Sequence, residues 1–333
     1  MSTDWQDGLA KSERALLRQR SQPRHVAPML ATLTENYFSD AHWIYERKLD
    51  GERIVAMRER GRVRLLTRNK KNVSHTYPEL SGALAKQPHD SFIVDGEVVA
   101  FAGGATSFAR LQQRMQIQSA EDARESGIKV YYYLFDLLYL DGWTTEAIGL
   151  RQRKAILKNA FAFSDPLRFT PHRNRQGERY FKTACAKGWE GIIAKKADSR
   201  YRHKRSHDWL KFKCSKGQEL VIAGYTPPQG TRLGFGALLL GYYDGDRLQY
   251  AGKVGTGFDD AQLKSLHEKL RKLRRETCPF DETVADKDAT WVTPKLVAEI
   301  GFTEWTRAGK LRHPRFLGLR RDKPAGDVTR ESI

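Results

Sequence analysis

The sequence predicts an α+β protein in which antiparallel sheets with flanking helices are followed by a small β-barrel. Its 333 residues suggest two or three domains. Before Cys214, apolar strands alternate with helical stretches; after it, short strands and one helix at 259–273 give the pattern of a five-stranded OB-fold. The expected parts are a basic N-terminal arm at 1–26, a first domain at 27–214 and an OB-fold domain at 215–333, with a hinge at 215–218.

The composition indicates a soluble globular protein. Hydrophobic residues make up 40% of the chain and charged residues 29%. No apolar run approaches the roughly 18 residues of a membrane span, and residues 1–20 lack the apolar core of a signal peptide. Cys185, Cys214 and Cys278 lie far apart, with neither a zinc pattern nor a disulfide framework, which fits a reducing cytoplasm.

The charge indicates a polyanionic partner. The formal net charge is +18, which points first to nucleic acid, with an ordinary basic enzyme as the alternative. An anionic membrane surface is disfavoured because no basic amphipathic helix stands out. Residues 1–25 are polar and basic, and we expect a partly helical or disordered arm that contacts phosphates; a solvated tail fits them equally well.

The stretch 43–53 carries the first candidate for chemistry. It predicts a strand that ends in an Asp50-Gly51 turn, with Glu46 and Lys48 on one face. A lysine beside a carboxylate suits a covalent nucleophile, but the amine attacks only when neutral. From a reference pKa of about 10.4, neutrality near pH 7 costs roughly 4–5 kcal/mol, which neighbouring cations or metal ions would reduce. The alternative is a hairpin with a surface lysine.

Two further polar groups interrupt the strands that follow. Arg68 ends a strand and is followed by Lys70 and Lys71, a cation cluster suited to a phosphate or a solvated charge run. Asp95 and Glu97 then share one face of the apolar strand at 92–100. Acids in such a strand are costly unless they are paired or metal-bound, so this pair suits Mg²⁺ or a ribose hydroxyl.

The rest of the first domain predicts helices and buried strands. Helices are expected at 77–86, 107–118, 150–160 and 177–187. The aromatic strand from 130 to 140 is most simply core. In the alternating strand at 209–213, Leu210 and Phe212 face the core, while Lys211 and Lys213 share the other face. Two adjacent lysines repel, so an anion such as a triphosphate is expected between them.

Taken together, these stretches resemble an ordered set of family motifs. Lys48-Leu49-Asp50-Gly51, followed by Arg53, resembles the Lys-x-Asp-Gly motif of nucleotidyltransferases that are adenylated or guanylated on lysine. Further motifs follow in the family's order, and many members have Gly where this chain has Asn69. They are Thr67-Arg68-Asn69, Asp95-Gly96-Glu97, Phe135-Asp136, Glu190-Gly191 through Lys195, Trp209 through Lys213, and a closing basic stretch at 311–323. The chain resembles ATP-dependent DNA ligases over about residues 27–325, especially the ligase domain of bacterial ligase D and its free-standing relatives.

The resemblance implies a nucleotidyltransferase (adenylation) domain that uses ATP with Mg²⁺ or Mn²⁺. Lys48 would take AMP from ATP, pass it to a 5′-phosphate, and the 3′-hydroxyl would then displace it. The family's roles carry over as follows: Glu46 for the adenine amino group; Phe135 for stacking on the purine; Glu97 and Glu190 for metal; Lys211 and Lys213 for the α-phosphate; Arg53 and Arg68 for the ribose or the DNA 5′-phosphate; Asp50 for orienting a neighbouring group; and Leu49, Lys195, Arg312 and Lys323 for further cofactor contacts.

The resemblance also implies partners and leaves alternatives. Nicked or broken duplex DNA is the expected substrate, with Ku or a separately encoded repair polymerase as candidate partners for a monomer at the bacterial nucleoid. A GTP-using mRNA capping-type enzyme and an RNA ligase share the lysine motif. A non-catalytic DNA-end-binding protein is the alternative from another class. An NAD-dependent ligase is disfavoured, because its four-cysteine zinc module cannot be built from three cysteines.

Overall fold

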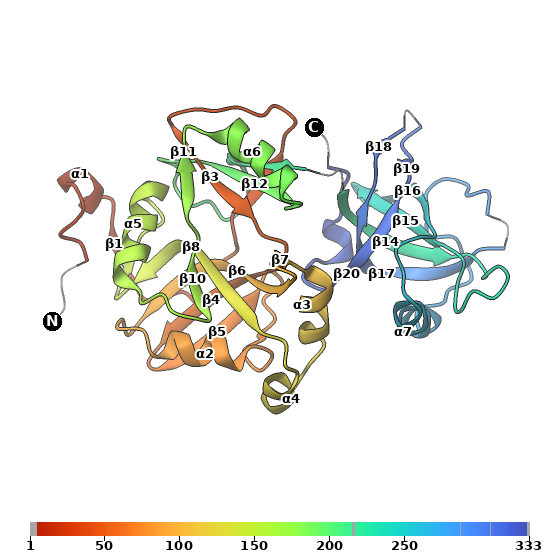
Figure 1. Ribbon diagram of the computed structural model, residues 1–333, viewed down its shortest axis with the longest axis horizontal. Coiled ribbons are helices and arrows are strands. Elements are labelled where there is room, and N and C mark those ends of the chain that lie inside the picture. Colours follow the sequence, from red (N-terminus) through yellow and green to blue (C-terminus); the bar gives the residue numbers. More distant parts are fainter. Residues whose placement is uncertain (1–4, 215–216, 287, 307, 332–333) are drawn as a thin grey trace. The chain divides into compact units, whose positions relative to one another are not determined.

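The computed structural model describes residues 5–214, 217–286, 288–306 and 308–331 (Figure 1). The chain divides into two compact units, with the boundary after Cys214. No helix in the described ranges is long and apolar enough to cross a bilayer. The expected hinge at 215–218 falls partly outside the described residues, and Gly217 and Gln218 begin a strand of the second unit.

The first unit is built on two sheets. The larger sheet follows the order β1-β9-β8-β6-β4-β5, with β10 added on β8 and β7 on β6, and only the β10–β8 pair is parallel. Its strands are β1 (Arg18–Gln19), β4 (Glu52–Glu59), β5 (Arg62–Thr67), β6 (Phe92–Ala102), β7 (Ala105–Thr106), β8 (Val130–Leu140), β9 (Trp143–Thr144) and β10 (Leu167–Phe169). The aromatic strand predicted at 130–140 is therefore a central strand.

The smaller sheet follows the order β11-β3-β12-β13-β2, in which only the β13–β2 pair is parallel. Its strands are β2 (Leu30–Leu33), β3 (Trp43–Lys48), β11 (His172–Asn174), β12 (Gly191–Lys196) and β13 (Arg205–Lys213). Ile44 and Trp209 from this sheet share a core cluster with Val55, Ile93 and Phe135 from the larger one. The two sheets therefore meet through apolar side chains.

Helices flank these sheets largely where the sequence predicts them. They are α1 (Lys11–Arg14), α2 (Pro78–Ala85), α3 (Phe108–Met115), α4 (Ala120–Glu125), α5 (Leu150–Ala160) and α6 (Gly177–Ala186). Ser107 caps α3 by accepting a hydrogen bond from the Arg110 amide. Helix α5 packs against β8, and α6 packs against β12 and β3. Among the described residues of this unit, α4 lies where no helix was expected, whereas α1 lies in the arm that was expected to be partly helical.

The described part of the expected arm, residues 5–26, is neither disordered nor a solvated tail. Leu9 and Leu17 are buried in the core of the first unit, and β1 pairs with β9 at the edge of the larger sheet. Arg20 also accepts a hydrogen bond from the Tyr139 hydroxyl through its carbonyl oxygen. The sequence conceals this packing because the few apolar residues of this charged stretch show no sustained helical or strand periodicity.

The cysteine prediction is wrong for one pair. Cys185, near the end of α6, and Cys214, just after β13, form a disulfide with their Cα atoms 5.2 Å apart. They are 29 residues apart in sequence. However, α6 packs on β12, which pairs with β13, so the fold brings them together. Cys278 is free and exposed. Cysteine usage therefore carries no argument for a reducing compartment.

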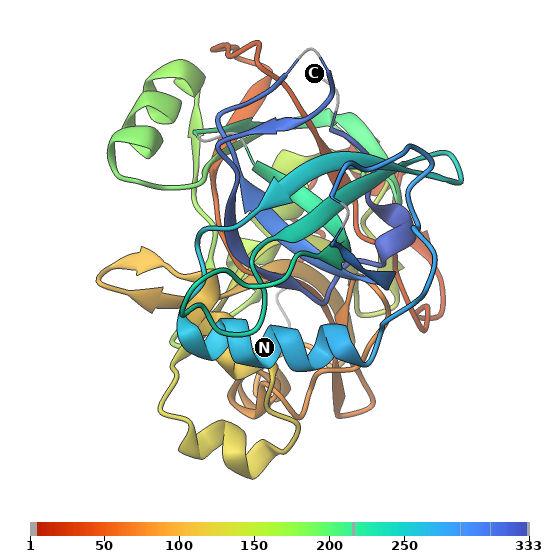
Figure 2. The same cartoon turned by 90° about the vertical axis from the view of Figure 1, so that its right-hand side faces the viewer.

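The second unit contains the five-stranded antiparallel sheet expected for an OB-fold, in the order β16-β15-β14-β17-β20. Helix α7 (Asp260–Arg271) is the light-blue helix of Figure 2. It buries Leu263, Leu266 and Leu270 in the core of this unit and starts with a capping box at Asp259. The other elements are β14 (Gly217–Tyr225), β15 (Leu238–Asp244), β16 (Arg247–Val254), β17 (Thr290–Gly301), β18 (Glu304–Trp305), β19 (Leu311–Arg312), β20 (Arg315–Arg320) and a 3₁₀ turn at Ala325–Asp327.

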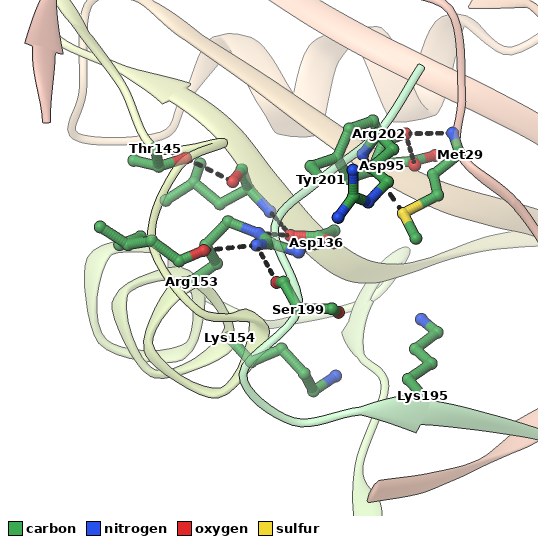
Figure 3. Close-up of polar contacts among 12 residues, drawn as sticks. Met29, Asp95, Asp136, Thr145, Arg153, Lys154, Lys195, Ser199, Tyr201 and Arg202 are labelled. Carbon is green, nitrogen blue, oxygen red and sulfur yellow. Dashed lines mark hydrogen bonds and ion pairs between the residues drawn. The ribbon is translucent and has the colours of Figure 1, made fainter. Parts of the chain in front are cut away.

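One fully buried ion pair joins α5 to β8. Arg153 donates to both carboxylate oxygens of Asp136, at 2.7 and 2.9 Å, and neither side chain is exposed (Figure 3). The remaining guanidinium nitrogen donates to the carbonyl oxygens of Ile148 and Ser199. Every nitrogen of Arg153 is thus hydrogen-bonded, which is the condition under which a buried arginine is tolerated.

We predict that Arg153→Met destabilises the first unit by about 3–5 kcal/mol, because it removes the arginine that compensates the buried charge of the Asp136 carboxylate. Equilibrium unfolding in urea measures the change. Lys158→Met, at an exposed position of the same helix, is the control and should change stability little. A double variant that also carries Asp136→Leu should be less destabilised than Arg153→Met alone. Equal loss in the single and double variants would contradict this account.

Candidate active site

Three neighbouring strands bring the predicted residues of the smaller sheet onto one face. The register places Lys48 of β3 opposite Gly191 of β12, and Gly191 opposite Lys213 of β13. Directly opposed residues, and residues two apart on one strand, project from the same face. The predicted site residues that share this face are Glu46, Lys48, Lys195, Lys211 and Lys213.

The opposite face of these strands is apolar. Tyr45, Ile192 and Phe212 form a buried cluster there with Tyr180 and Ala184 of α6. The alternation predicted for 209–213 is present, since Phe212 is fully buried while Lys211 and Lys213 are partly exposed. Helix α6 thus anchors one side of the sheet and leaves the charged side for chemistry.

A glycine allows the strands to meet beside Lys48. Gly191 has a φ of 148°, and a Cβ at this position would collide with the carbonyl oxygen of Phe212. Any side chain would therefore push β12 away from β13. The glycine of the Glu190-Gly191 motif keeps Glu190 directly next to the lysine strand.

Lys48 is paired with Glu190. Its Nζ lies 2.5 Å from Glu190 Oε2, and both side chains are about four-fifths buried. Burial disfavours the ammonium form, but the Glu190 carboxylate outweighs burial, and the pKa of Lys48 is raised above its ordinary value. Lys213 lowers the pKa of Lys48, as the sequence predicts for a neighbouring cation, but its effect is smaller than that of Glu190. The expected lowering of the Lys48 pKa is therefore absent, and Lys48 is charged while Glu190 faces it.

Glu46 lies in a deeply buried group with two lysines. Lys154 Nζ lies 2.6 Å from Glu46 Oε1, and Lys195 Nζ lies 2.6 Å from Glu46 Oε2. All three residues are at most 2% exposed. Burial alone would raise the pKa of Glu46, but the two lysines lower it. Burial also lowers the pKa of Lys195 to about 8, with Lys154 acting in the same direction and Glu46 opposing both.

Aromatic rings enclose the Lys195 ammonium. Its Nζ lies 4.1 Å from the ring centre of Phe135 and 4.0 Å from that of Trp209. The Arg53 guanidinium lies 4.5 Å from the Phe135 ring centre. Two cations thus already contact the ring that is predicted to stack on a purine. Stacking there requires one of them to move, and the role of Phe135 stays a prediction.

Several buried polar atoms around Glu46 lack hydrogen-bond partners within the described residues. They are Thr170 Oγ1, His172 Nδ1 and Trp209 Nε1, and Glu46 Oε1 has only its ion pair with Lys154. They lie close together because His172 pairs with Glu46 across β11 and β3, Lys154 donates to the Thr170 carbonyl, and Trp209 contacts Lys195. Buried polar groups are normally satisfied. A purine edge, which carries both donors and acceptors, fits such a set.

Arg53 and Asp95 are paired with each other, which differs from both predictions. Arg53 donates to both oxygens of Asp95, at 2.5 and 2.6 Å. The Tyr201 hydroxyl also donates to Asp95, at 2.5 Å (Figure 3). The Met29 amide donates to Tyr201 in turn. Asp95 is fully buried and its oxygens are occupied, so the expected use of Asp95 with Glu97 as a metal or ribose pair is wrong for Asp95. Arg53 reaches a ribose or phosphate only by leaving this pair.

The other predicted residues lie at several places. Glu97 is on β6 opposite Arg53, Leu49 and Asp50 follow β3, and Arg68 follows β5. No group of three or more His, Cys, Asp and Glu side chains suited to a metal occurs among the described residues, so metal at Glu97 and Glu190 stays a prediction. Arg312 and Lys323 belong to the second unit, where they pair with Glu304 at 2.7 Å and Glu219 at 3.1 Å.

Sequence reasoning missed Lys154. The sequence predicts a helix at 150–160 but gives Lys154 no role in the site. In the structure Leu150, Arg153, Lys154 and Leu157 are all buried. Their spacing is that of one helical face, so two basic residues occupy the apolar stripe of the helix. Charged residues at such positions are a usable signal for buried pairs.

Two family models match this chain: the ATP dependent DNA ligase domain over residues 28–213 and the ATP dependent DNA ligase C terminal region over residues 231–323. The chain belongs to the ATP-dependent DNA ligase family. The family's nucleotidyltransferase unit and C-terminal OB-fold are the two units described above, which confirms the predicted fold class.

Individual relatives of this ligase-family chain agree. The "Multifunctional non-homologous end joining protein LigD" of Pseudomonas aeruginosa is 40% identical over 318 residues, which are 93% of this chain and 37% of that protein. The "SPbeta prophage-derived DNA ligase-like protein LigB" of Bacillus subtilis is 31% identical over 298 residues, 89% of this chain and 99% of the relative. The chain thus spans less than half the length of the LigD relatives that it matches.

Solved structures agree with this assignment. The structure described as "mycobacterial DNA ligase D complexed with ATP and MES" has a TM-score of 0.64 and 34% identity. The match covers 92% of this chain and 98% of that one. The similarity therefore extends over both units of the chain.

We predict that Glu190→Gln makes the Lys48 amine more reactive near neutral pH. The substitution removes the carboxylate that raises the pKa of Lys48, so a larger fraction of the amine is neutral at any given pH. Competitive acetylation of nucleotide-free protein across a pH series, read by mass spectrometry at Lys48, measures the shift. Glu178→Gln, at an exposed position on α6, is the control. A titration of Lys48 that stays in place or moves to higher pH would contradict the pairing.

Proposed function

We propose that the protein is an ATP-dependent DNA ligase that seals breaks between a 5′-phosphate and a 3′-hydroxyl in duplex DNA through a covalent lysyl-AMP intermediate. The observation that carries the proposal is the shared strand face on which Lys48 and Glu46 lie beside Lys195, Lys211 and Lys213. One face of a single sheet thus carries the proposed nucleophile, the carboxylate proposed to recognise adenine, and a set of cations. Membership of the ligase family supports the same reading.

The first step uses Lys48. Its amine attacks the α-phosphorus of ATP, so a nitrogen–phosphorus bond forms and the bond to pyrophosphate breaks. Lys48 must lose a proton first, and Glu190, at 2.5 Å, is the adjacent base. Lys211 and Lys213 lie on the same face and would offset the charge that builds up on the phosphate.

Two transfers to DNA follow. An oxygen of the 5′-phosphate attacks the lysyl-AMP, which forms a phosphoanhydride and frees Lys48. The 3′-hydroxyl then attacks the DNA phosphorus, which forms the phosphodiester and releases AMP. Arg53 and Arg68 are the proposed contacts to the ribose or the 5′-phosphate. Arg53 can make this contact only after it leaves Asp95. Its change of partner, from the Asp95 carboxylate to the phosphate, would then separate the nucleotide step from the DNA steps.

A divalent metal is part of the proposal. Glu190 and Glu97 offer carboxylate oxygens, the donors that Mg²⁺ and Mn²⁺ prefer, and Glu190 already lies next to the nucleophile. The metal would neutralise phosphate charge during the transfers. A cation on Glu190 would also weaken its hold on Lys48. Arg312 and Lys323 of the second unit are proposed to orient the leaving pyrophosphate, and Leu49 and Lys195 to contact the nucleotide.

We infer the substrate and the cellular process from the net charge of the chain and from the names of its relatives. The net charge of +18 favours sequence-independent contact with duplex DNA, which should weaken steeply with salt. The matched LigD proteins carry non-homologous end joining in their names, so we place this chain in break repair in the bacterial cytoplasm at the nucleoid, as a monomer. Ku and a separately encoded repair polymerase are the candidate partners.

The decisive prediction is covalent labelling without DNA. Wild type incubated with α-labelled ATP and Mg²⁺ should retain label, Lys48→Ala should retain none, and Lys182→Ala, at an exposed position on α6, should behave as wild type. Added nicked duplex should then discharge the label and yield sealed strand. The measurement is gel autoradiography of protein first freed of bound AMP.

The alternatives predict other results in this assay. Label from GTP and not from ATP would indicate a capping-type guanylyltransferase. Label from ATP that is discharged on single-stranded RNA but not on nicked duplex DNA would indicate an RNA ligase. No label from either nucleotide, with DNA binding intact, would reject the ligase proposal and leave a non-catalytic DNA-end-binding protein.

A further inference from the structure

We propose that Lys154 is a positioning residue for base selection: its ammonium holds the Glu46 carboxylate ionised and turned to accept from the 6-amino group of adenine, so that the site selects ATP over GTP. The inference rests on the proposed function insofar as it takes the nucleotide base to lie at Glu46. It adds a residue that belongs to none of the sequence motifs described above.

Lys154 is held in place on several sides. It is 1% exposed, its Nζ lies 2.6 Å from Glu46 Oε1, and it donates to the Thr170 carbonyl oxygen at 2.9 Å. The ring of Phe169 lies 4.7 Å from the ammonium. Burial of a long charged side chain loses both hydration and rotamer entropy. The cost is offset only by specific partners, and Glu46 is the carboxylate that pairs with Lys154.

Neutralising Glu46 does not require Lys154. Lys195 already pairs with the other oxygen of Glu46, so the two lysines leave one excess positive charge in a water-poor site. His172, the strand neighbour of Glu46, has its pKa lowered by burial and then by Lys154, so it adds no compensating group. Lys195 has a pKa of about 8 and loses part of its charge near physiological pH. Lys154 therefore places positive charge beside Glu46 in addition to the part that Lys195 retains.

The donor and acceptor pattern fits adenine. Its edge presents an amino donor at position 6 beside an acceptor nitrogen at position 1, and guanine presents the reverse. An ionised carboxylate beside an ammonium is complementary to the adenine edge. Against guanine, the carboxylate would face the 6-oxo group and the ammonium would face the protonated ring nitrogen. A protonated Glu46 would lose this distinction, because it could donate to the 6-oxo group.

A pair held by Lys154 predicts a pH-dependent loss of selectivity. Without the ammonium of Lys154, Glu46 keeps its ion pair with Lys195, but burial raises its pKa against one lysine instead of two, so protonation of Glu46 at low pH becomes easier than in wild type. Lys154→Met should weaken ATP binding relative to wild type by about tenfold near pH 6 and reduce the ATP-to-GTP preference by a similar factor. Both losses should be larger at low pH than at high pH, because low pH favours the protonated form of Glu46. A purely structural role would shift binding of both nucleotides together at every pH.

The experiment measures equilibrium binding of ATP and of GTP by titration calorimetry from pH 6 to pH 8.5. It compares wild type with Lys154→Met, Lys154→Arg and Lys158→Met. Lys158 is exposed on the same helix and serves as the control. The arginine variant keeps the charge and should restore the preference. Lys154→Gln, which can still donate to the Thr170 carbonyl, tests the charge alone if the methionine variant fails to fold.

The outcomes separate the two proposals. An unchanged ATP-to-GTP ratio in folded Lys154→Gln or Lys154→Met at all pH values overturns the role of Lys154. Binding requires no covalent step, so a pH-dependent loss of selectivity in the variants supports the role even if wild type forms no lysyl-AMP. Wild type that binds neither nucleotide would reject both proposals.

Discussion

The arrangement of the candidate site depends on one constraint, the register of β3, β12 and β13. Because side chains alternate along a strand, this register places Lys48, Glu46, Lys195, Lys211 and Lys213 on one face and leaves the apolar residues for α6. A slip of one residue in any of these strands would move its charged residues into the apolar layer. The φ of 148° at Gly191 and its close contact with the Phe212 backbone hold the strands at the end nearest Lys48. The positions of separate motifs are thus consequences of one pairing.

The candidate site is also held by charge pairs between its own residues. Glu190 faces Lys48, Asp95 faces Arg53, and Glu46 faces two lysines. Each pair keeps buried charges compensated, but it also occupies the groups that a phosphate or a metal would use. The predicted catalytic groups are therefore paired with one another in the structure. A triphosphate would compete with these carboxylates for the cations, and a divalent ion would compete with the cations for the carboxylates.

Much of this could be predicted from the sequence, and the reasons are local. The helix at 150–160, the cap at Ser107 and the alternation before Lys213 follow from short-range patterns. The ion pairs do not, because Arg53 meets Asp95 only through the pairing of β4 with β6. Lys154 and the Cys185–Cys214 bond depend likewise on tertiary packing. The signal for Lys154 was present in the apolar stripe of its helix, but its partner could not be named before the sheets were in place.

The two predicted residues of the closing motif differ in how readily they can act on a nucleotide. Arg312 is 58% exposed and its partner Glu304 is 47% exposed, so their ion pair is weak in water and easily broken. Lys323 is 7% exposed and its partner Glu219 is 21% exposed, so breaking their ion pair removes one cation from a largely buried carboxylate. If both residues act on pyrophosphate, Arg312 can exchange Glu304 for the pyrophosphate at little cost. For Lys323, the new contact must offset the loss of its more buried ion pair with Glu219. Of the two, Arg312 is therefore better suited to a contact that forms and breaks in each catalytic cycle.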